Sequence, residues 1–311
     1  MKKFCLGIMC LLLHGLAACG KIDVVPVTSD VELALQLDYA AKANLPGGKT
    51  RCIIRAYSIE GGKQAKKHSA EMLLMQDMTE GYDFETTWKL PMGDYEIMVW
   101  SDLMEEDATI PFHNADDFGA ITLQGRHTGS NDWRNAFRGT ATVSLREEDE
   151  RCTLKMESPL AKFELVAEDL AEFMAKETQR RKGQSPVVGL KDYRVVFQYV
   201  GYMPNAFSIY TDRPVDSSTG VTFTSSLKEL NPTEASLGFD YVFVNDKESA
   251  VTVRVAIYDA EGTCLSTSRS IKVPLKRNQH TVLRGMYLTQ EASDGISIDN
   301  NYEGNFNLVI P

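Results

Sequence analysis

Apolar residues recur at every second position through most of the chain, and this period of two limits the folds that the sequence can adopt. In the segment 31–39, VELALQLDY, every odd-numbered residue is apolar or aromatic, so these side chains share one face of an extended chain. Segments 140–145, 152–156, 163–167 and 251–258 alternate in the same way. Such segments are typical of strands with one buried face.

Turns that contain glycine separate the alternating segments and leave little room for helices. They are predicted at residues 46–48, 60–62, 92–94, 218–220 and 259–262. Short strands at this spacing predict an all-β fold of the sandwich or barrel type.

Two short helices are expected beside the strands. The first covers residues 168–183: Glu168 favours the N-terminal end, the apolar side chains at 170, 173 and 174 share a face, and Gly183 can end the helix. Its apolar stripe is expected to contact the core. The second covers residues 63–80, where a continuous apolar run follows a basic cluster.

Two β-sandwich domains in tandem account best for the length of the chain and for the parallel features of its two halves. The boundary is expected near Ser158 and Pro159, just before the strand and helix that open the second half. The predicted organisation is a signal peptide at 1–18, a tether at 19–30, and Greek-key sandwiches at 31–157 and 158–311.

The N-terminus has the three parts of a bacterial export signal. Lys2 and Lys3 precede an apolar core at 4–13, which is too short to span a bilayer and is followed by small residues. Cys19 directly follows Leu-Ala-Ala, which resembles the lipobox of bacterial lipoproteins. That resemblance implies cleavage between Ala18 and Cys19 and a lipid on the cysteine; an ordinary signal with a chance cysteine is the alternative.

Charge and cysteine content exclude two classes of protein. The formal net charge of −10 argues against a nucleic-acid partner, which requires clustered lysine and arginine. Cys52, Cys152 and Cys264 lie far apart in strand-like segments without C-x-x-C pairs, so free buried thiols are expected instead of a disulfide framework.

Motifs for catalysis are missing from the sequence, which has no H-E-x-x-H, no G-x-S-x-G and no phosphate-binding glycine loop. His113 with Asp116 and Asp117 has the donors for a metal, but a polar turn explains these residues better. Residues 299–304 imitate the start of a calcium loop, although the twelfth position is Ile310. We therefore expect neither an enzyme nor a metal or cofactor.

Aromatic residues allow a different hypothesis, a surface lipoprotein that binds glycans. Trp133 lies in the polar stretch SNDWR and is the best candidate for an exposed ring that stacks on sugars. Trp88 and Trp100 occupy alternating strands, where burial is the commoner fate of a large ring. Tyr202 and Tyr210 belong to a further aromatic cluster that serves the hypothesis only if it is exposed.

Four stretches of sequence, together with the predicted lipid on Cys19, carry a family resemblance. They are CTLKMESPLAKFEL at 152–165, VGYMPNAFSIYTDRPVDSSTGVTFTS at 200–225, VPLKRNQHTVLRGMYLT at 273–289 and GISIDNNYEGNFNLVIP at 295–311. The chain in these parts resembles the fimbrillin-like lipoproteins of Bacteroidales, and within them a subgroup of uncharacterised domains.

The resemblance implies two transthyretin-like sandwiches and a structural role in adhesion at the cell outer membrane, on the cell surface, with palmitate-type acyl chains on Cys19. Subunits of that family polymerise by strand donation after a protease removes an N-terminal segment. Here the segment 31–39 is the strand for release, and Lys49 or Arg51 is the place for the cut. An anchor or accessory subunit that is never cut fits equally well.

Overall fold

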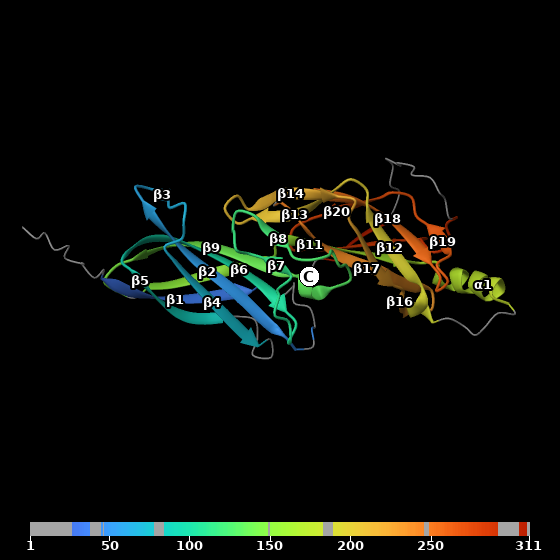
Figure 1. Cartoon of the computed structure of the whole chain (residues 1–311), viewed down its shortest axis with the longest axis horizontal. Helices are drawn as coiled ribbons and strands as arrows, with labels where there is room; N and C mark the ends of the chain where they lie inside the picture. Colours follow the sequence, from blue (N-terminus) through green and yellow to red (C-terminus); the bar gives the residue numbers. More distant parts are fainter. Residues whose placement is uncertain are drawn as a thin grey trace, which may run out of the picture.

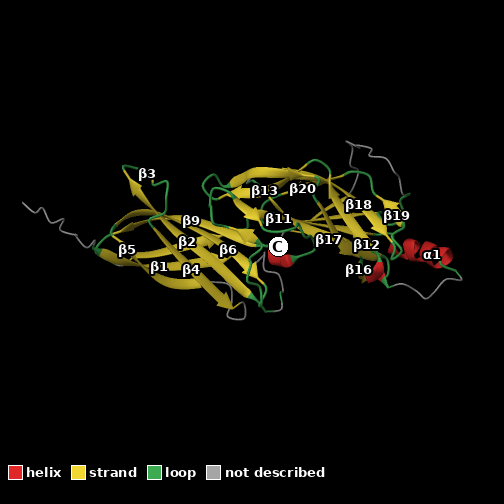
Figure 2. Cartoon of the chain, viewed as in Figure 1, coloured by secondary structure: helices red, strands yellow, loops and turns green. Residues whose placement is uncertain are grey.

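The computed structural model describes residues 27–37, 45, 47–77, 84–148, 150–182, 189–245 and 249–291, and the backbone of residues 305–309. Strands dominate these ranges, in which α1 (Leu170–Arg180) is the single α-helix. The molecule is elongated, with β1 and β5 near one end and α1 at the other (Figures 1 and 2). The predicted all-β class is therefore confirmed.

The first half of the chain forms a sandwich of two sheets. One sheet has three strands in the order β10 (Glu150–Met156), β1 (Thr28–Leu37), β5 (Phe84–Pro91). The facing sheet has the order β3 (Lys63–Gln64), β2 (Lys49–Glu60), β6 (Gly93–Met104), β9 (Ala136–Leu145), and β4 (Ala70–Asp77) pairs with β2. The alternate residues that face inward form one hydrophobic core between the sheets.

The second half forms a larger sandwich. Its first sheet has the order β16 (Lys228–Asn231), β17 (Glu234–Phe243), β11 (Leu160–Ala167), β21 (His280–Gly285), β22 (Asn305–Val309). Its second sheet has the order β15 (Thr222–Ser226), β12 (Arg194–Tyr199), β18 (Ser249–Tyr258), β19 (Cys264–Thr267), and β20 (Ile271–Leu275) pairs with β18. A second core fills the space between them.

A fifth sheet of the described chain joins the two halves. Its order is β14 (Arg213–Thr219), β13 (Tyr202–Ser208), β8 (Ile121–Leu123), β7 (His113–Asn114). The pairing of β8 with β13 crosses the expected domain boundary, because β8 comes from the first half of the chain. A third apolar cluster lies at this junction and contains Trp100 and Phe118 from the first half and Phe207 and Phe243 from the second. The halves are thus fused through a shared core.

The helical expectations have different outcomes. The helix expected at 168–183 exists as α1 (Leu170–Arg180), and its side chains Leu170 and Phe173 are buried in the second core. The expected cap Gly183 lies outside the described residues. The prediction of a helix at 63–80 is wrong, because this region contains the strands β3 and β4. The side chains of β4 alternate between half-buried and exposed, as in a strand.

The three cysteines among the described residues are free thiols, as expected. Cys52 and Cys152 are buried in the first sandwich, and Cys264 is half-buried in β19. Burial raises the pKa of Cys52 to about 12, so this thiol stays protonated and unreactive at neutral pH.

Two buried aspartates organise the polar contacts at the junction. The first is Asp240 of β17, which pairs with Arg134 from the short 3-10 helix η3 (Asp132–Arg134). The Oδ2 atom of Asp240 also accepts a hydrogen bond from the Tyr199 hydroxyl at 2.6 Å, and it lies 2.7 Å from His127 Nε2. Burial raises the pKa of Asp240, but Arg134 and the hydrogen bonds outweigh it and hold the pKa below its ordinary value.

The second buried aspartate is Asp102 of β6. Its carboxylate accepts a bidentate pair of hydrogen bonds from Arg51, at 2.8 and 2.6 Å, and one from the Trp100 indole at 3.1 Å. His113 of β7 is fully buried, with Nδ1 3.6 Å from Asp102 Oδ2 and its ring packed edge-on against Trp100. Burial lowers the pKa of His113 from its ordinary value of 6.5.

We expect the buried His113 to make folding stability depend on pH. The folded protein favours the neutral imidazole of His113. Below pH 6.5, His113 is therefore protonated in the unfolded chain but stays neutral in the folded one. Stability contributed by this group should therefore be lost as the pH falls from 7 toward 5, by at most about 1.4 kcal/mol per pH unit. His113→Phe should flatten this dependence in urea unfolding at pH 7, 6 and 5; an unchanged slope would contradict the assignment.

Candidate functional site

Strand β1 contains most of the segment that the sequence analysis expects to be released in strand donation. It lies in the middle of the three-stranded sheet, antiparallel to β5 and parallel to β10. Leu33 stands opposite Thr86 of β5 and Cys152 of β10. Since both of its edges are paired, β1 closes the gap between two strands that lie far apart in the sequence.

The inner face of β1 carries much of the first core. Val31, Leu33 and Leu35 are at most 1% exposed and pack with the side chains of the facing sheet. Complete burial of a side chain of this size contributes about 1.5 to 3 kcal/mol. Without β1, the first sandwich would have an open apolar groove bordered by the unpaired edges of β5 and β10, which is the geometry that accepts an added strand.

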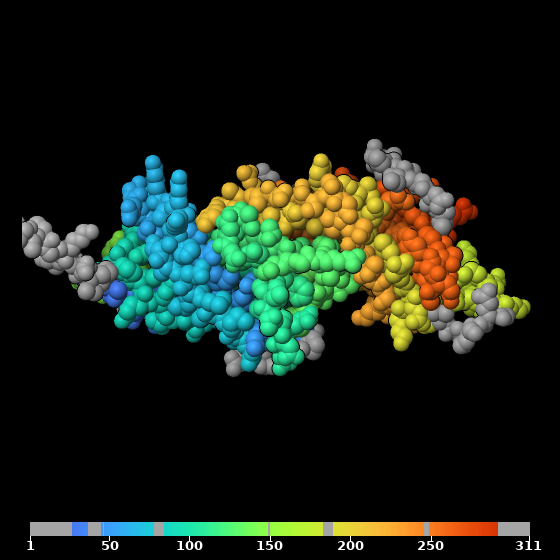
Figure 3. All heavy atoms as spheres, in the orientation of Figure 1, coloured from blue at the N-terminus to red at the C-terminus, as the bar shows by residue number. Residues whose placement is uncertain are grey.

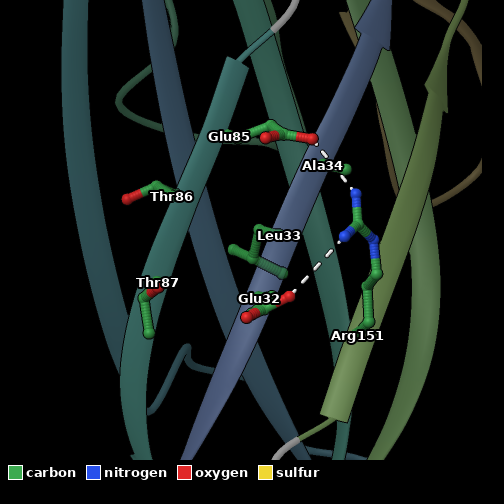
Figure 4. A pocket seen from close by; sticks show the side chains of 7 residues that line it. All are labelled: Glu32, Leu33, Ala34, Glu85, Thr86, Thr87 and Arg151. Atoms are coloured by element: carbon green, nitrogen blue, oxygen red, sulfur yellow. Dashed lines mark hydrogen bonds and ion pairs between the residues drawn. The ribbon is translucent and has the colours of Figure 1, made fainter.

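The outer face of β1 is polar and open to solvent. Arg151 of β10 reaches across it to Glu32 at 3.7 Å and to Glu85 of β5 at 3.1 Å (Figure 4). The small side chain of Ala34 leaves a shallow depression of about 350 Å³ beside these residues. All three charged side chains are more than 60% exposed, so the ion pairs contribute little to stability. The depression shows no buried polar group that would hold a ligand.

The two residues predicted for proteolytic processing lie in β2. Lys49 is its first residue, whereas Arg51 lies inside the strand and pairs with Met75 of β4 and Asp102 of β6. The Arg51 side chain is 14% exposed and also donates a hydrogen bond to the His113 carbonyl at 2.9 Å. Lys49 is paired in the same way, with Asp77 of β4 and Met104 of β6, so a protease would have to unpair β2 to cut at either residue.

Trp133, the predicted glycan-stacking residue, is half-buried in η3. The outer edge of its ring lies over Gly48, where a Cβ would approach the ring atom Cη2 to 2.4 Å. The ring thus covers the start of β2. Trp88 and Trp100 are buried as expected, whereas Tyr202 is 75% exposed and Tyr210 is 42% exposed.

Other residues singled out in the sequence are not gathered into a site. His113 is buried against Asp102, while Asp116 and Asp117 are exposed. The described residues contain no group of three or more metal-ligating side chains. Ala18, Cys19 and the loop 299–304 lie outside the described residues. None of the helices in the described ranges has the length and apolar character required to cross a bilayer.

Several solved structures are similar to this chain over most of its length. A candidate adhesin from Bacteroides thetaiotaomicron has 10% sequence identity and a TM-score of 0.49, over 83% of this chain and 91% of that one. The fimbrial anchor protein Mfa2 from Porphyromonas gingivalis has 8% identity and a TM-score of 0.42, over 82% and 90%. The tip fimbrial protein Mfa3 from the same organism has 9% identity and a TM-score of 0.41, over 91% and 99%.

Sequence comparison assigns the family. No curated protein sequence matches the chain. A family model described as "Family of unknown function (DUF6562)" matches residues 25–311, which include all the strands of both sandwiches and of the sheet between them. The chain therefore belongs to the DUF6562 family.

Proposed function

We propose that this protein is a lipid-anchored subunit of a fimbria-like adhesive assembly at the cell outer membrane, exposed on the cell surface. The export signal and the lipobox-like sequence before Cys19 support the anchor, and the resemblance to fimbrillin-like lipoproteins supports the assembly. The proposed role is structural, without catalysis and without a cofactor. We also retain 31–157 and 158–311 as the proposed transthyretin-like domains.

The position of β1 is the observation that carries the proposed mode of assembly. Because β1 follows the tether directly and fills the centre of a sheet, its removal would expose a groove that a strand from another subunit could fill. The added strand would restore the main-chain hydrogen bonds of β5 and β10 and insert alternate apolar side chains. Cleavage after Lys49, the first residue of β2, would release β1 and leave residues 50–60 of β2 in place.

The lipid anchor can be tested with Cys19→Ala. We expect the wild-type chain to fractionate with outer membranes and to carry a lipid mass on an N-terminal peptide that begins at Cys19. The variant should be unlipidated and should leave the membrane fraction, because two or three acyl chains on Cys19 supply the membrane affinity. Retention of the variant in the membrane would contradict lipid anchoring at this residue.

The same membrane preparation tests strand release. A species beginning just after Lys49, found only in high-mass assemblies, would support polymerisation after cleavage. A lipid-bearing chain with residues 28–37 still attached in those assemblies would identify an anchor or accessory subunit instead. Lys49→Gln should block the cut, while Lys63→Gln, a change of the same type in β3, should not.

A further inference from the structure

Strand β4 forms an open edge of the first sandwich. All eight of its residues pair with β2, and β4 pairs with no other strand of the described chain. Met72 and Leu74 pack against the first core, yet they remain only half-buried, as expected for side chains at the edge of a sheet. Figure 1 shows β4 at the border of the sandwich, and in Figure 3 the blue atoms of this part of the chain lie at the surface. The main-chain N–H and C=O groups of every second residue of β4 point away from β2, toward this open edge.

The outer face of β4 is largely apolar. Leu73 is 60% exposed and Met75 is 47% exposed, so both side chains are open to solvent. Glu71 lies on the same face and pairs with Arg55 of β2 at 2.6 Å, so its charge is balanced within the chain. The open edge of β4 is thus flanked by apolar side chains on both faces of the sheet.

Several other edge strands of the described chain have features that discourage pairing with a second molecule. β5 contains Lys89 and Pro91, and β14 contains Arg213 and Pro214. β16 has only four residues and a register shift. β4, in contrast, has eight residues with no lysine, arginine or proline, and its register against β2 is continuous. Basic side chains, proline, bulges and short length are the features that protect natural edge strands, so β4 is an edge suited to pairing.

The sequence of β4 allows the strand to pair with a copy of itself. A twofold axis perpendicular to the sheet would place two copies of β4 antiparallel, with the outer residues of both copies on one face. Of the two registers with the longest overlap, one has its axis beside Leu73 and sets Glu71 opposite Met75 of the other copy. The other has its axis beside Leu74 and sets Glu71 opposite Asp77, which is unfavourable because like charges face each other. The charges of the strand therefore favour the axis beside Leu73.

We propose that β4 pairs with β4 of a second copy of this chain across a twofold axis beside Leu73, so that one sheet continues through both molecules. Each copy uses a single edge in this contact, so the contact closes as a dimer. No strand leaves its own sandwich, which separates this pairing from strand donation. The pairing goes beyond the proposed assembly role and depends neither on the lipid nor on cleavage.

Sedimentation equilibrium of the full mature chain in detergent tests for the dimer. We expect a reversible equilibrium in which the dimer fraction rises with protein concentration, because an edge contact of this kind buries little surface. Leu73→Lys should weaken the dimer at least about tenfold, since it places two ammonium groups opposite each other at the axis. Leu73 is exposed, so the substitution leaves the core intact, and circular dichroism and thermal unfolding check that the variant is folded.

Leu230→Lys is the matched control for this measurement. Leu230 is a 46% exposed leucine on another edge strand, β16, so its change adds the same charge away from the proposed contact. It should alter the dimerisation constant less than about twofold. Equal weakening by Leu73→Lys and Leu230→Lys would overturn the proposal, as would a wild-type chain that stays monomeric up to its solubility limit.

Cysteine cross-linking tests the register. In Leu73→Cys the two new thiols lie opposite each other, with their Cα atoms about 5 Å apart, so a short bismaleimide should join two chains. In Met75→Cys the two thiols are four residues out of step, about 13 Å along the strands, and should be joined poorly. The wild-type chain gives the background from the half-buried thiol of Cys264.

The cross-linking result has three outcomes that would overturn the proposal. They are a lack of joined chains in Leu73→Cys, joining of Met75→Cys that is equally efficient, and joining of Leu73→Cys to a different protein in preference to a second copy. The last would assign the edge to a heterologous partner.

Discussion

Replacing Asp240 with alanine is expected to lower the free energy of unfolding by about 4 kcal/mol. The Asp240 carboxylate has no exposed surface, and Arg134, which pairs with it, is 3% exposed. Truncation would leave the Arg134 guanidinium buried with no counter-charge and would deprive the Tyr199 hydroxyl of its acceptor. Equilibrium unfolding in guanidinium chloride, followed by tryptophan fluorescence, measures the change.

Two further variants test the reason for this loss. Arg134→Met/Asp240→Leu removes both charges together and should recover a large part of the lost stability, because no unpaired ion remains. Glu85→Ala breaks an exposed ion pair on the first sandwich and should cost less than about 1 kcal/mol. A similar loss in Asp240→Ala and Glu85→Ala would show that the junction does not depend on the buried pair.

Leu33→Ala is expected to destabilise the first sandwich by about 3 kcal/mol. Leu33 is 1% exposed and lies in the centre of β1, so the substitution removes apolar contacts on the inner face and leaves a cavity between the sheets. The strand should consequently separate more easily from β5 and β10. Urea unfolding measures the loss, and hydrogen exchange of the β1 amides reports the easier separation.

Glu32→Ala provides the neighbouring control for this prediction. Glu32 is 61% exposed on the outer face of the same strand, and its change to alanine should alter stability by less than about 0.5 kcal/mol. If Leu33→Ala were as mild as Glu32→Ala, β1 would not hold the core closed, and the strand-exchange proposal would lose its energetic basis.

The period of two predicted β1, β9, β10, β11 and β18, because the buried and exposed residues of a half-buried strand alternate along the sequence. Residues 31–37 of the expected segment 31–39 lie in β1, and 251–258 lies within β18. Residues 38 and 39 lie outside the described residues. The helix α1 was also predictable, since its apolar stripe has the helical period. The alternation in β4 was obscured by the run Met72, Leu73, Leu74 and Met75, whose members are apolar on both faces of the strand.

The polar junction could not be predicted, since its members come from distant parts of the chain. Asp240 and Arg134 are separated by 106 positions and meet only when β17 packs against η3. Both look like ordinary surface charges in the sequence.

The central position of β1 has a mechanical consequence. The strand begins at one end of the molecule and runs inward between β5 and β10. A pull on Thr28 along the strand axis loads the hydrogen bonds on both edges of β1 in shear, so they must break together and not one after another. While β1 is in place, the strand therefore resists tension applied along its axis.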